Sequence, residues 1–500
     1  MHLQDIYAIS PVLDTYSFYA SDSNSDHHHY MSRLPHVGTQ ARGSAPATSG
    51  IVPMTLMEQQ TLLMANNKAK KLRKFPATPS QKSSSSSFVS RLYASQIPGE
   101  TFKAAYLKVL LHNELREGIC SNVPILLIDL LFPSKNLPFA VDKTLLDDLK
   151  WMKVDENGVK APGVWTGDRF RDPPTKFTEE ELAGWMNKLA QAMSNATNKA
   201  IRRSWSHHTQ DTPPAGSVAQ CKPDLVLLDT TYLSRIQNHS DVFTDWTFIR
   251  AIAEVTSEKR SPQRMFDTVI TKSFLSFQSQ PARRFTISLS FNGSGDMVFT
   301  LADREGLLRI SEVNIMGGGQ VSALIFLKIL AVLMFGTDSD IGLDPNYKID
   351  AFTGKVTAIT VQDKHFEVEN LVYSLDSLIG RATRVWVVRR NGQRFVLKDS
   401  WNQADRVDSE EKFLAAISAS PRDVAKDSLP TLICGGDVTI DSIPDTTTRY
   451  RTGLVGYIRE RVHRRIVCSP VGESLTNFRD KKEFIGAMID VINGEVLFQT

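Results

Sequence analysis

Lys398 and Glu410 are the two residues whose types and spacing point most directly to chemistry. Lys398 ends the apolar run RFVLK, and Glu410 follows about twelve residues later, early in a predicted helix. A lysine ammonium placed in this way pairs with nucleotide phosphates, and a carboxylate on the following helix holds it in position. Glu410 is preferred to Glu411, because Phe413 and Leu414 then stand at the inward-facing spacings of the helix. The pair predicts a nucleotide site, and the alternative is an ordinary solvent-exposed lysine at a strand end.

The segments that position this pair are predicted to form a sheet and a helix. KVTAITVQDKHFEVENLVYSL and RVWVVRRNGQRFVLKDSW alternate apolar and polar residues, as half-buried strands do. Asn391-Gly392 predicts a two-residue turn between antiparallel strands, the second of which is expected to end at Lys398. Gly380 lies between two strands, and Thr383 stands where the last glycine of a phosphate-covering loop belongs. SEEKFLAAISAS predicts the helix, and a five-stranded sheet with one helix suits residues 348–475.

This order resembles the small lobe of a protein kinase, and the wider sequence resembles the fungal-type protein kinase family. The segments that carry the resemblance are RFVLKDSW, DSLPTLICGG and RVHRRIVCSPVGESLTNFRDKKEFIGAMIDVI, together with KPDLVLLD, FQSQPARRFTISLSFNG and FTLADREGLLRI upstream. The resemblance implies that Lys398 contacts the phosphates of ATP and that Glu410 is its ion-pair partner. It places Gly380 and Thr383 in the phosphate loop. It also makes Ser469 to Val471 the hinge that faces adenine through its backbone.

For a full-length relative, the resemblance implies transfer of the γ-phosphate of ATP to Ser or Thr hydroxyls of a protein substrate. That reaction needs a catalytic-loop Asp as the base, and an Asn and a D-F-G Asp that hold magnesium. His463-Arg464-Arg465 is not an H-R-D loop, because Ile466 and Val467 follow it, and the sequence has no D-F-G. We therefore expect no catalytic residue in this chain, and Mg²⁺ only with an added large lobe. We interpret the chain as a fragment or shortened relative, or else as an inactive pseudokinase that acts through a protein partner.

A second pattern lies upstream of this region. Pro223-Asp224 opens an apolar strand, and Glu254 falls in another strand about thirty residues later. In restriction-endonuclease-like enzymes, two such carboxylates on adjacent strands hold Mg²⁺, and a lysine helps to position the attacking water. Thr256 stands where that lysine belongs, and Lys259 or Lys272 replaces it only if the fold brings one to the carboxylates. The pattern predicts a degenerate nuclease-like domain, beside the simpler alternative of an unrelated α/β domain.

The expected fold class is a multidomain α/β and α+β protein. Residues 1–95 are biased to Ser, Gly and His and predict a disordered tail. Residues 96–345 predict a mixed α/β domain, and 346–500 the kinase-like domain. ETFKAAYLKVLLHNEL predicts one helix of the α/β domain, with Val109 among its buried residues, and a Thr178–Glu181 capping box starts another. Arg283 and Arg284 are candidates for a phosphate site, but we expect them at a solvent-exposed helix end.

Composition narrows the classes of partner and location. Lys and Arg total 58 against 55 Asp and Glu, and a net charge of +3 makes nucleic acid an unexpected partner. Four cysteines without a C-x-x-C pair exclude a disulfide framework and a zinc ribbon. The most apolar stretch, 321–335, is too short to span a membrane, and no secretory leader is visible. These features predict a soluble intracellular protein, cytoplasmic or nuclear, with no membrane partner.

Overall fold

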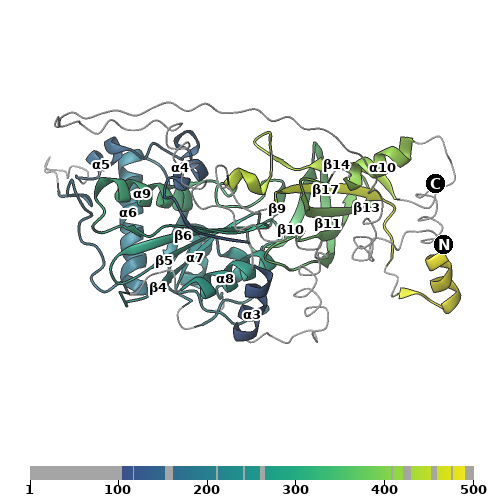
Figure 1. Ribbon diagram of the computed structural model, residues 1–500, viewed down its shortest axis with the longest axis horizontal. Coiled ribbons are helices and arrows are strands. Elements are labelled where there is room, and N and C mark those ends of the chain that lie inside the picture. Colours follow the sequence, from purple (N-terminus) through teal and green to yellow (C-terminus); the bar gives the residue numbers. More distant parts are fainter. Residues whose placement is uncertain are drawn as a thin grey trace, which may run out of the picture.

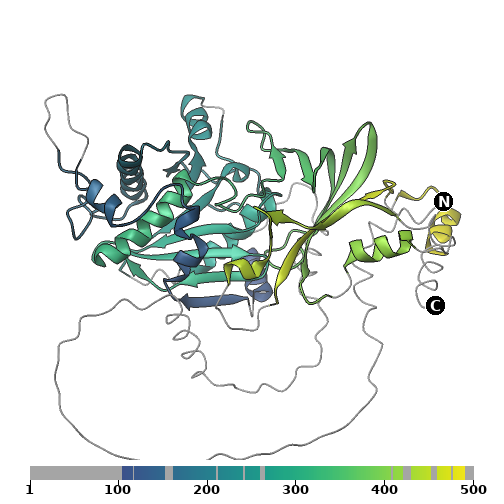
Figure 2. The same cartoon turned by 90° about the horizontal axis from the view of Figure 1, so that it is seen from above.

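Two β-sheets organise the protein in the computed structural model (Figure 1). The structure describes residues 104–115, 118–151, 161–209, 212–239, 242–259, 265–406, 409–419, 430–451, 459–473 and 477–489. Among these residues, the first sheet has eight strands and helices on both faces, and we call it with its helices the α/β unit. The second has seven strands, and we call it the antiparallel sheet. The two lie next to one another (Figure 2), and the predicted tail, 1–95, lies outside the described residues.

The sheet of the α/β unit is mixed, as the sequence predicted. Its order is β1-β7-β6-β5-β4-β3-β2, with β8 beside β6. β1 pairs in parallel with β7, and β4 with β5, whereas the remaining neighbours are antiparallel. The strands are β1 (Ile119–Val123), β2 (Arg203–Ser206), β3 (Leu225–Asp229), β4 (Ala251–Val255), β5 (Thr286–Phe291), β6 (Asp296–Asp303), β7 (Gly306–Ile310) and β8 (Val313–Asn314).

Helices bury both faces of this sheet. The helices are α3 (Ala104–Glu114), α4 (Leu127–Leu131), α5 (Lys143–Asp148), α6 (Glu179–Thr197), α7 (Thr230–Asn238), α8 (Phe266–Ser279) and α9 (Gly319–Phe335), with the 3-10 turns η3 (Ser134–Asn136) and η4 (Trp246–Phe248). Leu225 and Leu227 of β3 join the core under α6 and α9, whereas Val226 and Leu228 join the core under α3 and α8. This alternation is the two-residue period of a strand covered on both sides.

Local signals in the sequence set several helix limits. Thr178 accepts the Glu181 backbone N–H at 3.3 Å and begins α6, as the capping box predicted. The apolar helix α9 is buried along most of its length, and no helix among the described residues is long and apolar enough to cross a membrane. In α3 the predicted buried stripe is wrong at Val109, which is 57% exposed. Leu107 faces the core there instead, and Leu110 and Leu111 are buried as the same stripe predicted.

The antiparallel sheet has the order β14-β17-β13-β12-β11-β10-β9. Its strands are β9 (Tyr347–Ile349), β10 (Val356–Val361), β11 (Lys364–Ser374), β12 (Arg384–Arg390), β13 (Gln393–Gln403), β14 (Thr431–Asp437) and β17 (Arg461–Ser469), and smaller elements are α10 (Glu410–Ala419), β15 (Thr439–Ile440), β16 (Ile443–Pro444) and η7 (Thr447–Tyr450). Asn391 and Gly392 have φ of 51° and 80°, as the predicted hairpin turn requires. Residues 481–489 are also helical.

Two predictions for this sheet need correction. Within the described residues it has seven strands rather than five, because β9 and β10 extend it beyond β11. Strand β13 does not end at Lys398 but continues to Gln403, since its pairing with β17 runs on through Trp401 and Asn402. Lys398 and Asp399 are therefore central residues of a central strand, and their side chains point to opposite faces of the sheet.

Candidate nucleotide site and the buried network behind it

Lys398 and Glu410 form an ion pair on the face of the antiparallel sheet that α10 covers. The Lys398 ammonium Nζ lies 2.6 Å from Glu410 Oε2. The Lys398 side chain is buried, whereas that of Glu410 is about one-third exposed. Leu414 packs beneath the helix as predicted, but Phe413 is 44% exposed, so its predicted inward position is wrong. A buried ammonium held by one partly exposed carboxylate retains donors for a second anion.

The loop that carries Gly380 lies at the same end of the sheet. Leu375 N–H donates to Thr383 O at 2.8 Å and closes the loop between β11 and β12. Gly380 has a φ of 101°, in a region that L side chains rarely adopt. Two residues after Thr383, Val385 lies opposite Lys398 in the sheet. The fold thus brings the predicted loop beside the predicted lysine.

The predicted hinge, Ser469 to Val471, follows the end of β17. Cys468 lies opposite Val396 of β13, and Ser469 lies opposite Thr431 of β14. The hinge residues are therefore one strand away from the strand of Lys398. The predicted nucleotide-site residues come from the loop between β11 and β12, from β13 and α10, and from the end of β17 and the residues after it.

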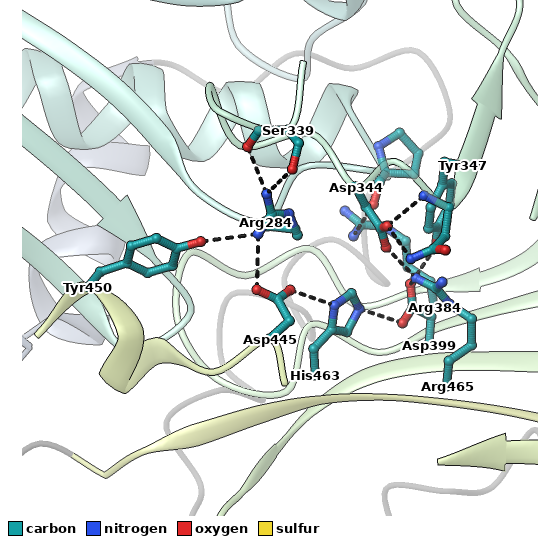
Figure 3. Close-up of polar contacts among 12 residues, drawn as sticks. Arg284, Ser339, Asp344, Tyr347, Arg384, Asp399, Asp445, Tyr450, His463 and Arg465 are labelled. Atoms are coloured by element: carbon teal, nitrogen blue, oxygen red, sulfur yellow. Dashed lines mark hydrogen bonds and ion pairs between the residues drawn. The ribbon is translucent and has the colours of Figure 1, made fainter. Parts of the chain in front are cut away.

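Behind Lys398, on the opposite face of β13, Asp399 enters a buried network that joins the two sheets (Figure 3). His463 of β17 lies between two carboxylates, with Nε2 2.7 Å from Asp399 Oδ1 and Nδ1 3.0 Å from Asp445 Oδ2. The indole of Trp401 stacks on the His463 ring at 4.5 Å between centroids. The imidazole is thus fixed on both edges and on one face.

Residues of the α/β unit and of the segment leading to β9 complete this network. Arg284, just before β5, donates to Asp445 Oδ1 at 3.0 Å and to the Tyr450 hydroxyl at 3.1 Å. Arg465 donates to Asp344 Oδ2 at 2.6 Å and to Asp399 Oδ2 at 3.1 Å. Tyr347 donates its hydroxyl proton to Asp399. These bonds connect β13 and β17 with the α/β unit, as Figure 3 shows.

The charges of the network balance when His463 is protonated. The ionised groups joined by these bonds are the cations Arg284, His463 and Arg465 and the carboxylates of Asp344, Asp399 and Asp445. Burial lowers the pKa of His463, but the carboxylates of Asp399 and Asp445 outweigh it and raise that pKa to about 9. Burial likewise raises the pKa of Asp399, but Arg465 and His463 hold it well below its usual range. His463 is therefore protonated at neutral pH.

Sequence reasoning missed this network. The prediction that Arg283 and Arg284 lie at a solvent-exposed helix end is wrong, since both are buried to 2% exposure. Arg283 donates to the Ile341 carbonyl at 2.7 Å, a bond of long sequence separation. The one available signal was the density of basic residues in RVHRR, which lies in a strand otherwise apolar enough to be buried.

The upstream carboxylates also come together in the structure. Leu225 pairs with Ala253, so Asp224 and Glu254 are neighbours across β3 and β4, and the Val255 N–H donates to Asp224 Oδ2 at 2.8 Å. Lys272 of α8 forms an ion pair with Glu254 inside the α/β unit.

Burial sets the ionisation of these acids. It raises the pKa of Glu254 to about 7 although the Lys272 ammonium opposes it, and it also raises the pKa of Asp224. Of the two replacement lysines named from the sequence, Lys272 reaches Glu254, whereas Lys259 is exposed.

Fold and site together define a two-sheet protein in which an α/β unit supports an antiparallel sheet bearing a lysine–glutamate ion pair. The family model of the fungal protein kinase matches residues 222–458 and 444–499, which is more than half of the chain. The chain therefore belongs to the fungal protein kinase family. No curated protein and no solved structure matches it.

Proposed function

We propose that the antiparallel sheet binds ATP, with the Lys398 ammonium contacting the phosphates and Glu410 holding that ammonium in place. The observation that carries the proposal is the 2.6 Å ion pair between them. Counted from β11, the lysine lies on the third strand and the glutamate on the helix that follows it. This is the arrangement with which protein kinases hold the nucleotide phosphates. The buried side chains of Val385, Val396 and Cys468 offer an apolar surface beside the lysine.

Binding and phosphoryl transfer are separate parts of the proposal. Transfer to a Ser or Thr hydroxyl needs an acceptor for the hydroxyl proton and acidic ligands for Mg²⁺. The sequence has neither an H-R-D nor a D-F-G segment, and His463, the residue nearest in pattern, is buried between two carboxylates. The function proposed for these 500 residues is therefore nucleotide-dependent recognition of a protein partner. We propose kinase activity only for a protein that also has the proton acceptor and the acidic ligands for Mg²⁺.

Thermal melting with and without Mg-ATP tests the nucleotide site. We expect ATP to stabilise the wild-type protein and to leave Lys398→Met unchanged, because methionine fills the space without the ammonium. Lys348→Met is the matched control, since Lys348 is an exposed lysine on β9 of the same sheet. It should respond to ATP as the wild type does. An equal response from Lys398→Met, or none from the wild type, overturns the proposal.

One observation supports a second candidate function, hydrolysis of a phosphodiester by the α/β unit. The contact between Lys272 and Glu254 supplies a lysine that the strand pattern lacked at Thr256. In such a reaction the two carboxylates hold Mg²⁺, water attacks phosphorus, and the bond to the leaving oxygen breaks. Burial of Glu254 at 3% exposure favours the degenerate, non-cleaving form of this domain.

Incubation of duplex DNA with Mg²⁺ decides between the two forms. Asp224→Asn and Glu254→Gln should abolish any true activity, and Glu180→Gln, an exposed acid in the first turn of α6, should not. Cleavage that is absent, or equal in all four proteins, rejects the nuclease.

A further inference from the structure

Two backbone N–H groups of the loop between β11 and β12 donate hydrogen bonds to the α/β unit. The Ile379 N–H donates to Glu114 Oε1 at 2.9 Å, and the Gly380 N–H donates to the Arg304 carbonyl at 2.8 Å. Glu114 is the last residue of α3, and Arg304 lies in the turn between β6 and β7. Loops that cradle phosphate do so with backbone N–H groups of this kind. Here two of them are already bonded to acceptors of the protein.

The Glu114 carboxyl group accepts a hydrogen bond from the loop inside the protein, as a phosphate oxygen would in a complex. It is 7% exposed. Burial raises its pKa to about 7, and hydrogen bonds from the Ile379 and Leu378 backbone, with the charge of Arg304, act in the opposite direction. The loop therefore stabilises the ionised carboxylate. A phosphate that is to be bound by the same donors has to displace it.

Side-chain packing prevents the loop from breaking these two hydrogen bonds without also breaking its other contacts with the α/β unit. Leu378 is fully buried in the core that α3 and α8 form. The Arg304 guanidinium lies 3.9 Å from the ring centre of Phe277 and donates to the Ser377 carbonyl at 2.7 Å. Release of the backbone donors thus requires the loop to withdraw from the α/β unit as a whole.

We propose that the α/β unit restrains the nucleotide site, because Glu114 and the Arg304 carbonyl occupy backbone donors of the Gly380 loop that a nucleotide phosphate needs. The inference rests on the proposed function, and it names how that site is regulated. The restrained state is the one seen in the structure. The permissive state has the loop withdrawn and its N–H groups directed at the phosphates held by Lys398.

Nucleotide affinity in the full chain tests this inference. Titration calorimetry with Mg-ATP should give a Kd for Glu114→Ala about tenfold lower than for the wild type, since one charge-assisted hydrogen bond no longer competes. Glu114→Gln keeps an acceptor oxygen without the charge and should fall between the two. Asp267→Ala is the matched control, because Asp267 contacts Lys108 and His112 of α3 without touching the loop. It should bind as the wild type does.

Hydrogen exchange of the peptide over residues 375–383 gives a second readout that needs no nucleotide. We expect faster exchange in Glu114→Ala than in the wild type and in Asp267→Ala. Wild-type exchange rates and affinity in Glu114→Ala, or weaker binding by a variant that melts normally, overturn the inference and leave the proposed function intact. Absence of ATP binding in every variant overturns both. If Glu114→Ala does not fold, Glu114→Gln provides the same comparison.

Discussion

Replacement of His463 by glutamine tests the energetic account of the buried network. In the wild type the imidazolium offsets two carboxylates, Asp399 and Asp445, which it contacts at 2.7 and 3.0 Å. Glutamine removes the positive charge and the stacking on Trp401. Each carboxylate keeps one other cation, Arg465 or Arg284, so the variant buries one uncompensated negative charge rather than two.

The expected loss follows from that remaining charge. Removal of one partner from a buried ion pair costs about 3–5 kcal/mol, and the retained arginines place His463→Gln at the lower end, about 3 kcal/mol in the free energy of unfolding. The loss depends on pH with a definite sign. The folded-state pKa of His463, about 9, lies above its ordinary value of 6.5. Its contribution is therefore complete below pH 6.5 and disappears as the pH rises through 9.

Urea unfolding followed by tryptophan fluorescence measures this difference. The gap between wild type and His463→Gln should be largest at pH 6 and should shrink steadily toward pH 9.5. Arg389→Gln is the control, because Arg389 pairs with Glu369 at the surface and exposed pairs contribute less than about 1 kcal/mol. A gap below about 0.5 kcal/mol at pH 6, or one that does not change with pH, would falsify the charge-balance argument.

Four further predictions concern stability. At pH 8, where Glu254 is ionised, Glu254→Gln leaves the Lys272 ammonium buried without its carboxylate and should cost about 3 kcal/mol. Lys272→Met should lose less free energy of unfolding at pH 6 than at pH 8, because Glu254, whose pKa is already about 7, can be protonated at the lower pH. Urea titrations at the two pH values measure this variant and Glu254→Gln. Gly392→Ala should cost about 1 kcal/mol from its φ of 80° alone, since an added Cβ meets no atom within 4 Å. Thr178→Ala removes the N-cap of α6 and should lower the free energy of unfolding by about 1 kcal/mol, also measured in urea. An unchanged free energy of unfolding in Gly392→Ala or in Thr178→Ala rejects the explanation given for that position.

Local patterns predicted much of the secondary structure. Alternation identified β12 and β13, and Asn391-Gly392 identified the turn between them. The Lys398–Glu410 contact was predicted because both residues lie on consecutive elements about twelve residues apart. Strand β9 could not be recognised in this way, since the three residues Tyr347–Ile349 are too few to show a period.

The buried network could not be predicted from the sequence, and the reason is physical. Its bonds join residues far apart in sequence, such as Arg284 with Asp445 and His463 with Asp399. A basic residue is usually exposed, so Arg284 was assigned to the surface. Only the tertiary arrangement shows that its partner is a carboxylate from the far end of the chain.

The two faces of strand β13 have different roles, and this has a consequence for how the two units evolve. Lys398 serves the nucleotide site on one face, while Asp399 serves the contact with the α/β unit on the other. The family match likewise begins at residue 222, inside the eight-stranded sheet, and continues across both units. A gene rearrangement that moved the antiparallel sheet alone would carry Asp399, His463 and Arg465 away from Arg284 and Asp344. We therefore expect the two units to occur together in members of the family, and we expect substitutions at Arg284 to be accompanied by compensating changes at Asp445.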